Sequence, residues 1–157
     1  MIFGRVPIRD VRSLDDVAAF AASESGDVVL IFDVDNTLAP QGAPLEEFTV
    51  LVNGAIDRFE AIGSVARVIA LSNGPQRGVP RMIARGNKPW TSRRRLGLGR
   101  TDSIVVVGDQ MLTDGLLAWR LRATFLHLVI DDQEEERRQA NMRRIGTLLT
   151  GMLFRRS

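Results

Sequence analysis

Uninterrupted apolar runs alternate with segments of helical spacing along most of the chain. Such runs are typical of parallel strands buried on both faces, and they predict strands over Val28–Phe32, Val65–Leu71, Ile104–Val107 and Thr124–Ile130. Apolar residues at helical spacing predict helices over residues 13–24, 45–62, 112–121 and 133–153. Strands that alternate with helices indicate a three-layer α/β fold with a mainly parallel central sheet.

Local signals set some boundaries and leave one segment undecided. Ser13 followed by Asp16 is the pattern of a helix capping box. In residues 74–99, glycine and proline break any helix, and Arg81–Arg85 could form a short strand. The connection Pro75–Pro80 is shorter than the dozen or so residues that a parallel crossover usually needs, so the pattern does not decide the structure of this segment.

The composition is that of an ordinary globular domain, with 157 residues, 45% hydrophobic and 25% charged. We expect one domain over residues 1–157, with a core over about residues 26–131. The absence of cysteine excludes disulfides, thiolate zinc sites and a cysteine nucleophile. No apolar run approaches the roughly 20 residues of a membrane span, and no signal peptide is recognisable, so a cytoplasmic protein is expected.

Arginine carries nearly all of the positive charge, and Lys88 is the one lysine among 21 Lys and Arg residues. The run from Arg77 to Arg100 has eight basic residues and no acidic one, and a second basic set comprises Arg143, Arg144, Arg155 and Arg156. A basic surface attracts anionic lipid headgroups, at about 1 kcal/mol per residue, and nucleic-acid phosphates. A solvated charged face is the alternative interpretation.

Three predicted strands end in polar clusters. With Lys88, which precedes Pro89 at an expected helix start, the clusters supply Asp33, Asp35, Asn36, Thr37, Ser72, Asn73, Asp109, Gln110 and Asp114. The carboxyl ends of parallel strands meet at one edge of a sheet, where ligands bind. Each cluster alone also fits turn or capping chemistry, and Lys88 alone fits a surface charge, but their joint occurrence favours a site.

The order of these residues resembles the haloacid dehalogenase-like (HAD) superfamily of phosphohydrolases. Its pattern of D-x-D-x-T, a strand ending in Ser or Thr, a lysine, and a strand followed by G-D and a further aspartate matches Asp33/Asp35/Thr37, Ser72, Lys88 and Asp109/Asp114. The words FDVDNTLAP, LSNG, NKP and VVVGDQMLTD are similar to the YqeG-like branch of subfamily IIIA, which is related to mitochondrial-type phosphatidylglycerophosphate phosphatases. The resemblance covers roughly residues 28–130 and implies a Rossmann-like HAD fold.

The resemblance also implies a Mg²⁺-dependent phosphomonoester hydrolase. Asp33 is the implied nucleophile, which forms an aspartyl-phosphate, and Asp35 is the implied general acid and base. Mg²⁺ would be held by Asp33, the backbone carbonyl of Asp35, and Asp109.

The remaining candidates would bind phosphate or support the site. Ser72, Asn73 and Lys88 are expected to bind the phosphoryl group, Lys88 as a compact positive charge. Asp114 is expected to orient Lys88 or the surroundings of the metal. A supporting role is also expected for Asn36, Thr37 and Gln110, whereas His127, in the middle of a strand, is expected to be a packing residue.

The chain has room for one helix between Asp35 and Ser72, and for less between Ser72 and Lys88. We therefore expect a capless, open site. An open site beside a basic surface suits a large phosphate ester, and the resemblance favours phosphatidylglycerophosphate at an anionic membrane surface. A phosphatase for a soluble sugar phosphate or nucleotide is the alternative, and a non-catalytic module that binds RNA is less favoured.

Overall fold

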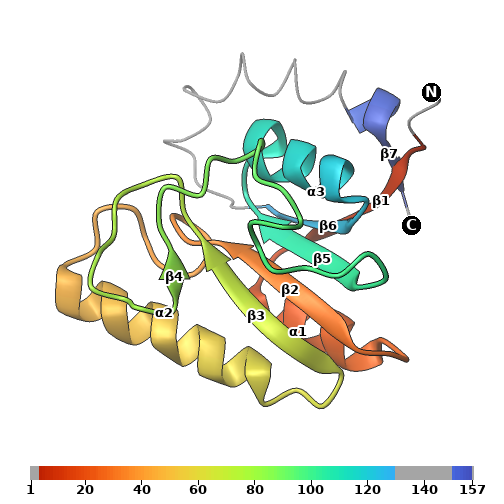
Figure 1. The fold of residues 1–157 in the computed structure, drawn as a ribbon. Helices are drawn as coiled ribbons and strands as arrows, with labels where there is room; N and C mark the ends of the chain where they lie inside the picture. Colours follow the sequence, from red (N-terminus) through yellow and green to blue (C-terminus); the bar gives the residue numbers. More distant parts are fainter. Residues whose placement is uncertain (1–3, 130–149, 157) are drawn as a thin grey trace.

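The structure, a computed structural model, describes residues 4–129 and 150–156 (Figure 1). Within these residues, seven strands form one sheet in which all neighbours are parallel. The described elements are β1 (Val6–Val11), α1 (Leu14–Ser23), β2 (Val28–Asp33), α2 (Leu45–Glu60), β3 (Val65–Leu71), β4 (Met82–Ile83), β5 (Ser103–Gly108), η1 (Met111–Gly115), α3 (Leu116–Leu121), β6 (Thr124–Leu128) and β7 (Phe154–Arg156). The predicted α/β fold with a parallel sheet is confirmed.

Helices cover both faces of the sheet (Figure 1), because a strand directs alternate side chains to opposite faces. On one face, Leu30 and Phe32 of β2 pack with buried residues of α1 and α2. On the other face, Val29 and Ile31 pack with α3. All six residues of β2 are buried, as its uninterrupted apolar run predicts.

The strand order, β4-β3-β2-β5-β6-β1-β7, reverses at β2. From β2 the chain proceeds to β3 and β4 on one side, and it then returns to β5 on the other side of β2. The carboxyl ends of β2 and β5 therefore flank a switch point of the kind where α/β proteins bind ligands. All three polar clusters follow strands β3, β2 and β5, which are neighbours.

Most predicted elements are present, with ends that differ by a few residues. Helix α1 begins after Ser13, which forms the predicted capping box with Asp16. The regular helix expected over residues 112–121 is instead a π-helical turn, η1, followed by the short helix α3. Strand β6 ends at Leu128, before the expected end of the strand.

Strands β1 and β7 were not predicted, and they extend the sheet beyond β6. The predicted helix over residues 133–153 lies largely outside the described residues, of which residues 150–153 are helical. Arg143 and Arg144 also lie outside the described residues. Among the helices that the structure describes, none is long and apolar enough to span a membrane.

The segment between β3 and β5 is mostly loop. Strand β4 falls within the candidate strand Arg81–Arg85 and pairs in parallel with β3, although no helix connects the two. The expected helix start at Pro89 is wrong, because residues 88–102 form turns and irregular loop and contain no helix. Gly97, with a φ of 65°, interrupts helical geometry there. The Arg93 guanidinium also fixes the turns by donating to backbone carbonyls, those of Gly99, Arg100 and Leu121.

Candidate active site

Two buried carboxylates share the ammonium group of Lys88. Its Nζ donates to Asp33 Oδ1 at 2.5 Å and to Asp114 Oδ1 at 2.7 Å. The side chains are 4% (Lys88), 6% (Asp33) and 1% (Asp114) exposed. Asp33 lies at the end of β2, Lys88 in the loop after β4, and Asp114 in η1. The one lysine of the chain is therefore buried among the candidate residues, and the alternative of a surface charge is wrong.

The loop after β3 holds Lys88 in position. The Ser72 N–H donates to the Ile83 carbonyl and the Gly86 N–H donates to the Ser72 carbonyl, which continues the pairing of β3 with β4. The side chain of Asn73 makes two hydrogen bonds to the backbone of Lys88. Its Oδ1 accepts from the Lys88 N–H at 2.7 Å, and its Nδ2 donates to the Lys88 carbonyl at 3.2 Å. The sequence predicts phosphate binding by Asn73, and this positioning contact was missed.

Gly108 and the π-helical turn bring Asp114 to Lys88. A Cβ atom at Gly108 would lie 2.2 Å from Asp114 Oδ2, so glycine leaves the space that the carboxylate occupies. The turn is closed by a bond of 3.2 Å from the Gly115 N–H to the Gln110 carbonyl. The Gln110 N–H also donates to Asp114 Oδ2 at 3.2 Å. Single π turns of this kind are frequent at functional sites.

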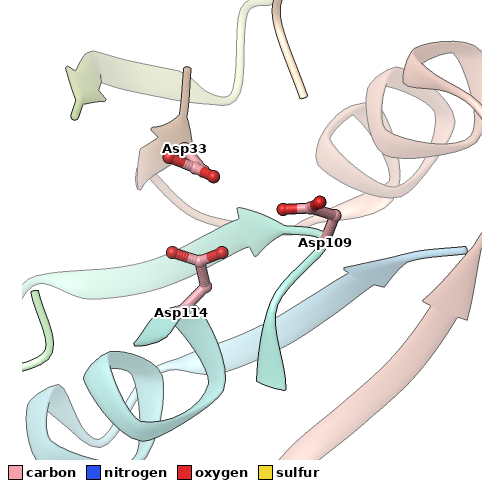
Figure 2. Close-up of side chains that lie close together, drawn as sticks. All are labelled: Asp33, Asp109 and Asp114. Carbon is pink, nitrogen blue, oxygen red and sulfur yellow. The ribbon is translucent and has the colours of Figure 1, made fainter. Parts of the chain in front are cut away.

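Asp109 completes a group of three carboxylates. Figure 2 shows Asp33, Asp109 and Asp114 converging on a common space, and one oxygen of each lies within 4.8 Å of the others. Carboxylate oxygens are the ligands that Mg²⁺ prefers, so this donor set fits a divalent cation. The predicted ligands Asp33 and Asp109 belong to the group. The side chain of Asp35 does not, and Asp114 stands beside the other two.

The ionisation of the group reflects burial and crowding. Burial, with the nearby Asp114, raises the pKa of Asp33 to about 6 against the opposing effect of Lys88. Burial likewise raises the pKa of Asp114. Burial would lower the pKa of Lys88, but the two carboxylates together raise it. A divalent cation bound by these carboxylates would favour their ionised forms and so oppose the effect of burial on their pKa values.

Asp35 lies on the more exposed side of the site, with 33% of its side chain exposed. Its Oδ2 accepts a hydrogen bond of 3.2 Å from Ser72 Oγ, and its Oδ1 lies 3.7 Å from Arg77 Nη1. The Gly74 N–H donates to Ser72 Oγ at 2.9 Å. The structure thus brings together the expected acid and base and the expected phosphate-binding hydroxyl. Arg77, which the sequence indicates only as part of a basic run, joins them.

The other candidates lie around the site. Asn36 has a φ of 61° and accepts the Gln41 N–H at Oδ1. Thr37 is buried, and its hydroxyl has no hydrogen-bond partner among the described residues. The exposed side chain of Gln110 accepts a bond from Thr113. The hydrogen bonds of Asn36 and Gln110 stabilise the turns that follow β2 and β5. His127 of β6 contacts Asp10 of β1 at 3.0 Å.

Several arginines of the basic run are engaged within the fold. Arg81 forms ion pairs with Asp57 and Glu60. Arg93 donates to the carbonyls named above, and Arg95 donates to the Arg85 carbonyl. Part of the charge that the sequence suggests for a docking surface therefore joins the β3–β4 loop to α2 and holds the loops between β4 and β6 together.

Comparison of the chain with protein-family models, curated proteins and solved structures gave no significant match. The function of the site is therefore inferred from its own residues and geometry, together with the motif resemblance.

Proposed function

We propose that this protein is a Mg²⁺-dependent phosphomonoester hydrolase of the HAD type. The observation that carries the proposal is the contact of Lys88 with both Asp33 and Asp114, beside Asp109, at the carboxyl edge of the sheet. Phosphoryl transfer needs a nucleophile, a positive charge for the phosphoryl oxygens and oxygen ligands for a divalent cation. This set of residues can supply all three.

In the proposed reaction, Asp33 attacks phosphorus with Oδ2. The hydrogen bonds from Lys88 Nζ and the Val34 N–H are both accepted at Oδ1, which leaves Oδ2 for the new bond. The bond from phosphorus to the alcohol oxygen breaks, and Asp35 gives a proton to the departing alkoxide. Asp35 then takes a proton from the water that attacks the aspartyl-phosphate, which releases inorganic phosphate and restores Asp33.

Lys88 and Ser72 would bind the phosphoryl oxygens. An ammonium in a dry environment stabilises developing negative charge far better than one in water. Asp114 holds the Lys88 ammonium and Asn73 holds its backbone, so the charge is fixed before the substrate arrives. Mg²⁺, bound by Asp33 and Asp109 with Asp114 or the Asp35 carbonyl as a further ligand, would neutralise the carboxylates and the phosphoryl oxygens together.

The favoured substrate is phosphatidylglycerophosphate at the cytoplasmic surface of a membrane, on the motif resemblance. Besides loops, the described chain between Asp35 and Ser72 has α2 and β3, and between Ser72 and Lys88 it has β4, which supports a capless site open to a large substrate. A soluble sugar phosphate or nucleotide is the second candidate. RNA binding is less favoured, because a module without catalysis need not retain the complete set Asp33, Asp35, Ser72, Lys88 and Asp109.

A phosphatase screen over lipid and soluble phosphate esters, with Mg²⁺ or with EDTA, tests the proposal. Asp33→Asn keeps the shape of the side chain but removes the nucleophile, so activity is expected to fall by about 10⁴-fold or more. Asp15→Asn is a matched control, because Asp15 is an exposed residue of α1 that pairs with Arg58. Full turnover by Asp33→Asn, or activity that is indifferent to EDTA, would contradict the proposal.

A further inference from the structure

Arg77 is a cation that the fold holds in place beside the candidate site. Its guanidinium carbon lies 4.1 Å from the ring centroid of Phe48, a fully buried residue of α2. Its Nη2 donates to the Ala43 carbonyl at 2.8 Å. Stacking on an aromatic ring combined with a hydrogen bond restricts a side chain that is otherwise among the most flexible. Arg77 is nevertheless 28% exposed, so it is both fixed and accessible.

The position of Arg77 relative to the proposed chemistry is specific. The two oxygens of the Asp35 carboxylate face different partners, Oδ2 the Ser72 hydroxyl and Oδ1 the Arg77 guanidinium. Asp35 therefore stands between the residue proposed to bind the phosphoryl group and Arg77. A proton donor to the leaving group must lie next to the ester oxygen. A substrate with its phosphoryl group at Ser72 and its ester oxygen at Asp35 then directs its alcohol portion towards Arg77.

Most N–H donors of the Arg77 guanidinium have no hydrogen-bond partner among the described residues. A guanidinium has five N–H groups, and among the described residues one hydrogen bond from Arg77 is found, to Ala43. The distance of 3.7 Å to Asp35 is that of an ion pair and not of a hydrogen bond. A planar guanidinium with free N–H groups suits bidentate binding of a carboxylate or a phosphate.

We propose that Arg77 is a specificity-determining residue that binds an anionic group on the alcohol portion of the substrate. This inference rests on the proposed phosphatase function and deepens it. The preferred substrates are phosphate monoesters whose alcohol carries a second negative charge, either a phosphodiester, as in a lipid headgroup, or a carboxylate, as in a soluble phosphorylated acid. The chemistry that Arg77 recognises is the same in both.

The test compares three esters in Mg²⁺: glycerol 3-phosphate, whose alcohol is neutral, 3-phosphoglycerate, whose alcohol carries a carboxylate, and phosphatidylglycerophosphate in detergent micelles, whose alcohol carries a phosphodiester. The readout is the ratio of kcat/KM for each anionic ester to that for glycerol 3-phosphate. For at least one anionic ester, Arg77→Gln should lower this ratio by about 10–100-fold, mainly through KM, as expected for loss of a charged hydrogen bond. The ester that responds identifies the source of the anion.

Arg81→Gln is the matched control. It removes the same charge from the same loop, but Arg81 pairs with Asp57 and Glu60 of α2, so the ratio should not change. Arg77→Lys, which keeps the charge without the planar fork, should give an intermediate ratio. Thermal melting of each variant shows whether it is folded.

The outcomes separate this inference from the proposed function. Suppose that wild type hydrolyses these esters but Arg77→Gln lowers all three activities by the same factor. Arg77 then only stabilises the packing of its loop against α2, and the inference is wrong. Unchanged ratios in Arg77→Gln and Arg77→Lys would overturn it equally. If wild type hydrolyses no phosphate ester in Mg²⁺, the proposed function itself fails, and this inference fails with it.

Discussion

The ammonium of Lys88 donates a hydrogen bond of 2.5 Å to the carboxylate of Asp33, although 55 positions of the chain separate the two residues. Both side chains are buried. Removing one partner of such a pair leaves an uncompensated charge inside the protein, which commonly costs about 3–5 kcal/mol. The ammonium that the proposed reaction needs is therefore also needed for the stability of the fold around the site.

Lys88→Arg tests whether this charge must be compact. A planar guanidinium is larger than an ammonium and cannot donate from the same point to both Asp33 and Asp114. We expect kcat to fall by at least about 100-fold, as when one preorganised donor to a transition state is lost. Steady-state kinetics with a circular-dichroism spectrum as a folding control measures this. A near-normal kcat would mean that Lys88 does not act on the phosphoryl group.

Gly108→Ala tests the close packing behind Asp114. The new Cβ would overlap the Asp114 carboxylate, which must move and weaken its bond to Lys88. We expect a lower melting temperature and activity reduced by about tenfold or more.

Gly54→Ala is the matched control for Gly108→Ala. A Cβ at Gly54, an exposed position of α2, meets no atom within 4 Å. It should stabilise the helix by up to about 1 kcal/mol and leave activity unchanged. Equal behaviour of the two variants would contradict the role assigned to Gly108.

Stability should depend on pH and Mg²⁺ together. Because the pKa of Asp33 is raised to about 6 in the fold from 3.8, the folded state binds more protons than the unfolded state between these values. Without metal, this carboxyl therefore stabilises the protein at low pH, and the contribution is lost as pH rises through about 6. Protons and Mg²⁺ compete for the same oxygens, so Mg²⁺ should raise the melting temperature more at pH 7 than at pH 5.

Thermal melts in EDTA and in Mg²⁺ at the two pH values measure this effect. Asp109→Asn, which removes one carboxylate of the group, should reduce the Mg²⁺ shift at pH 7. A shift that is equal at both pH values, or absent at both, would argue against a metal site at Asp33.

Membrane attraction should depend on arginines that the fold leaves exposed. Arg93 and Arg95 donate to backbone carbonyls, so replacing them would disturb the loop itself. Arg94 and Arg100 are exposed members of the same run. The double variant Arg94→Gln/Arg100→Gln should bind anionic liposomes about 30-fold more weakly, at about 1 kcal/mol for each of the two lost charges near the surface.

A liposome co-sedimentation series in increasing salt measures this binding, which salt should screen. The double variant Arg5→Gln/Arg12→Gln removes the same charge from exposed positions that flank β1, outside the basic run, and should bind nearly as wild type does. If wild type ignores anionic liposomes, the membrane-surface hypothesis fails and a soluble substrate is favoured.

The buried strands were predictable because burial on both faces leaves an uninterrupted apolar run, as in β2, β3 and β5. Strand β1 was not, because its buried and exposed positions mix and it contains Pro7 and two charged residues. It is fixed by distant partners, since Ile8 pairs with Phe125 of β6 and with Arg156 of β7. Strand β7 has only three residues, two of them exposed arginines, so it has no apolar run that would mark it as a strand.

The candidate site divides in the same way. Asp33, Ser72 and Asp109 were predictable because each directly follows or ends a strand at one edge of the sheet. Two contacts depend on how the loops fold against each other. They are the hydrogen bonds from Asn73 to the Lys88 backbone and the ion pair of Arg77 with Asp35. No local pattern of residues encodes such contacts. The sequence therefore indicates Asn73 and Arg77 as notable residues but does not predict which residues they contact.

Trapping the covalent intermediate tests the central claim most directly. Asp35→Asn keeps the nucleophile but lacks the base that activates water, so with a radiolabelled aryl phosphate, whose leaving group needs little protonation, phosphorylated protein should accumulate. After an acid quench and digestion, the account predicts label on the peptide that contains Asp33. It predicts more label in Asp35→Asn than in wild type and none in Asp33→Asn. Consumption of the ester without label on Asp33, or equal labelling of Asp33→Asn, would contradict the account.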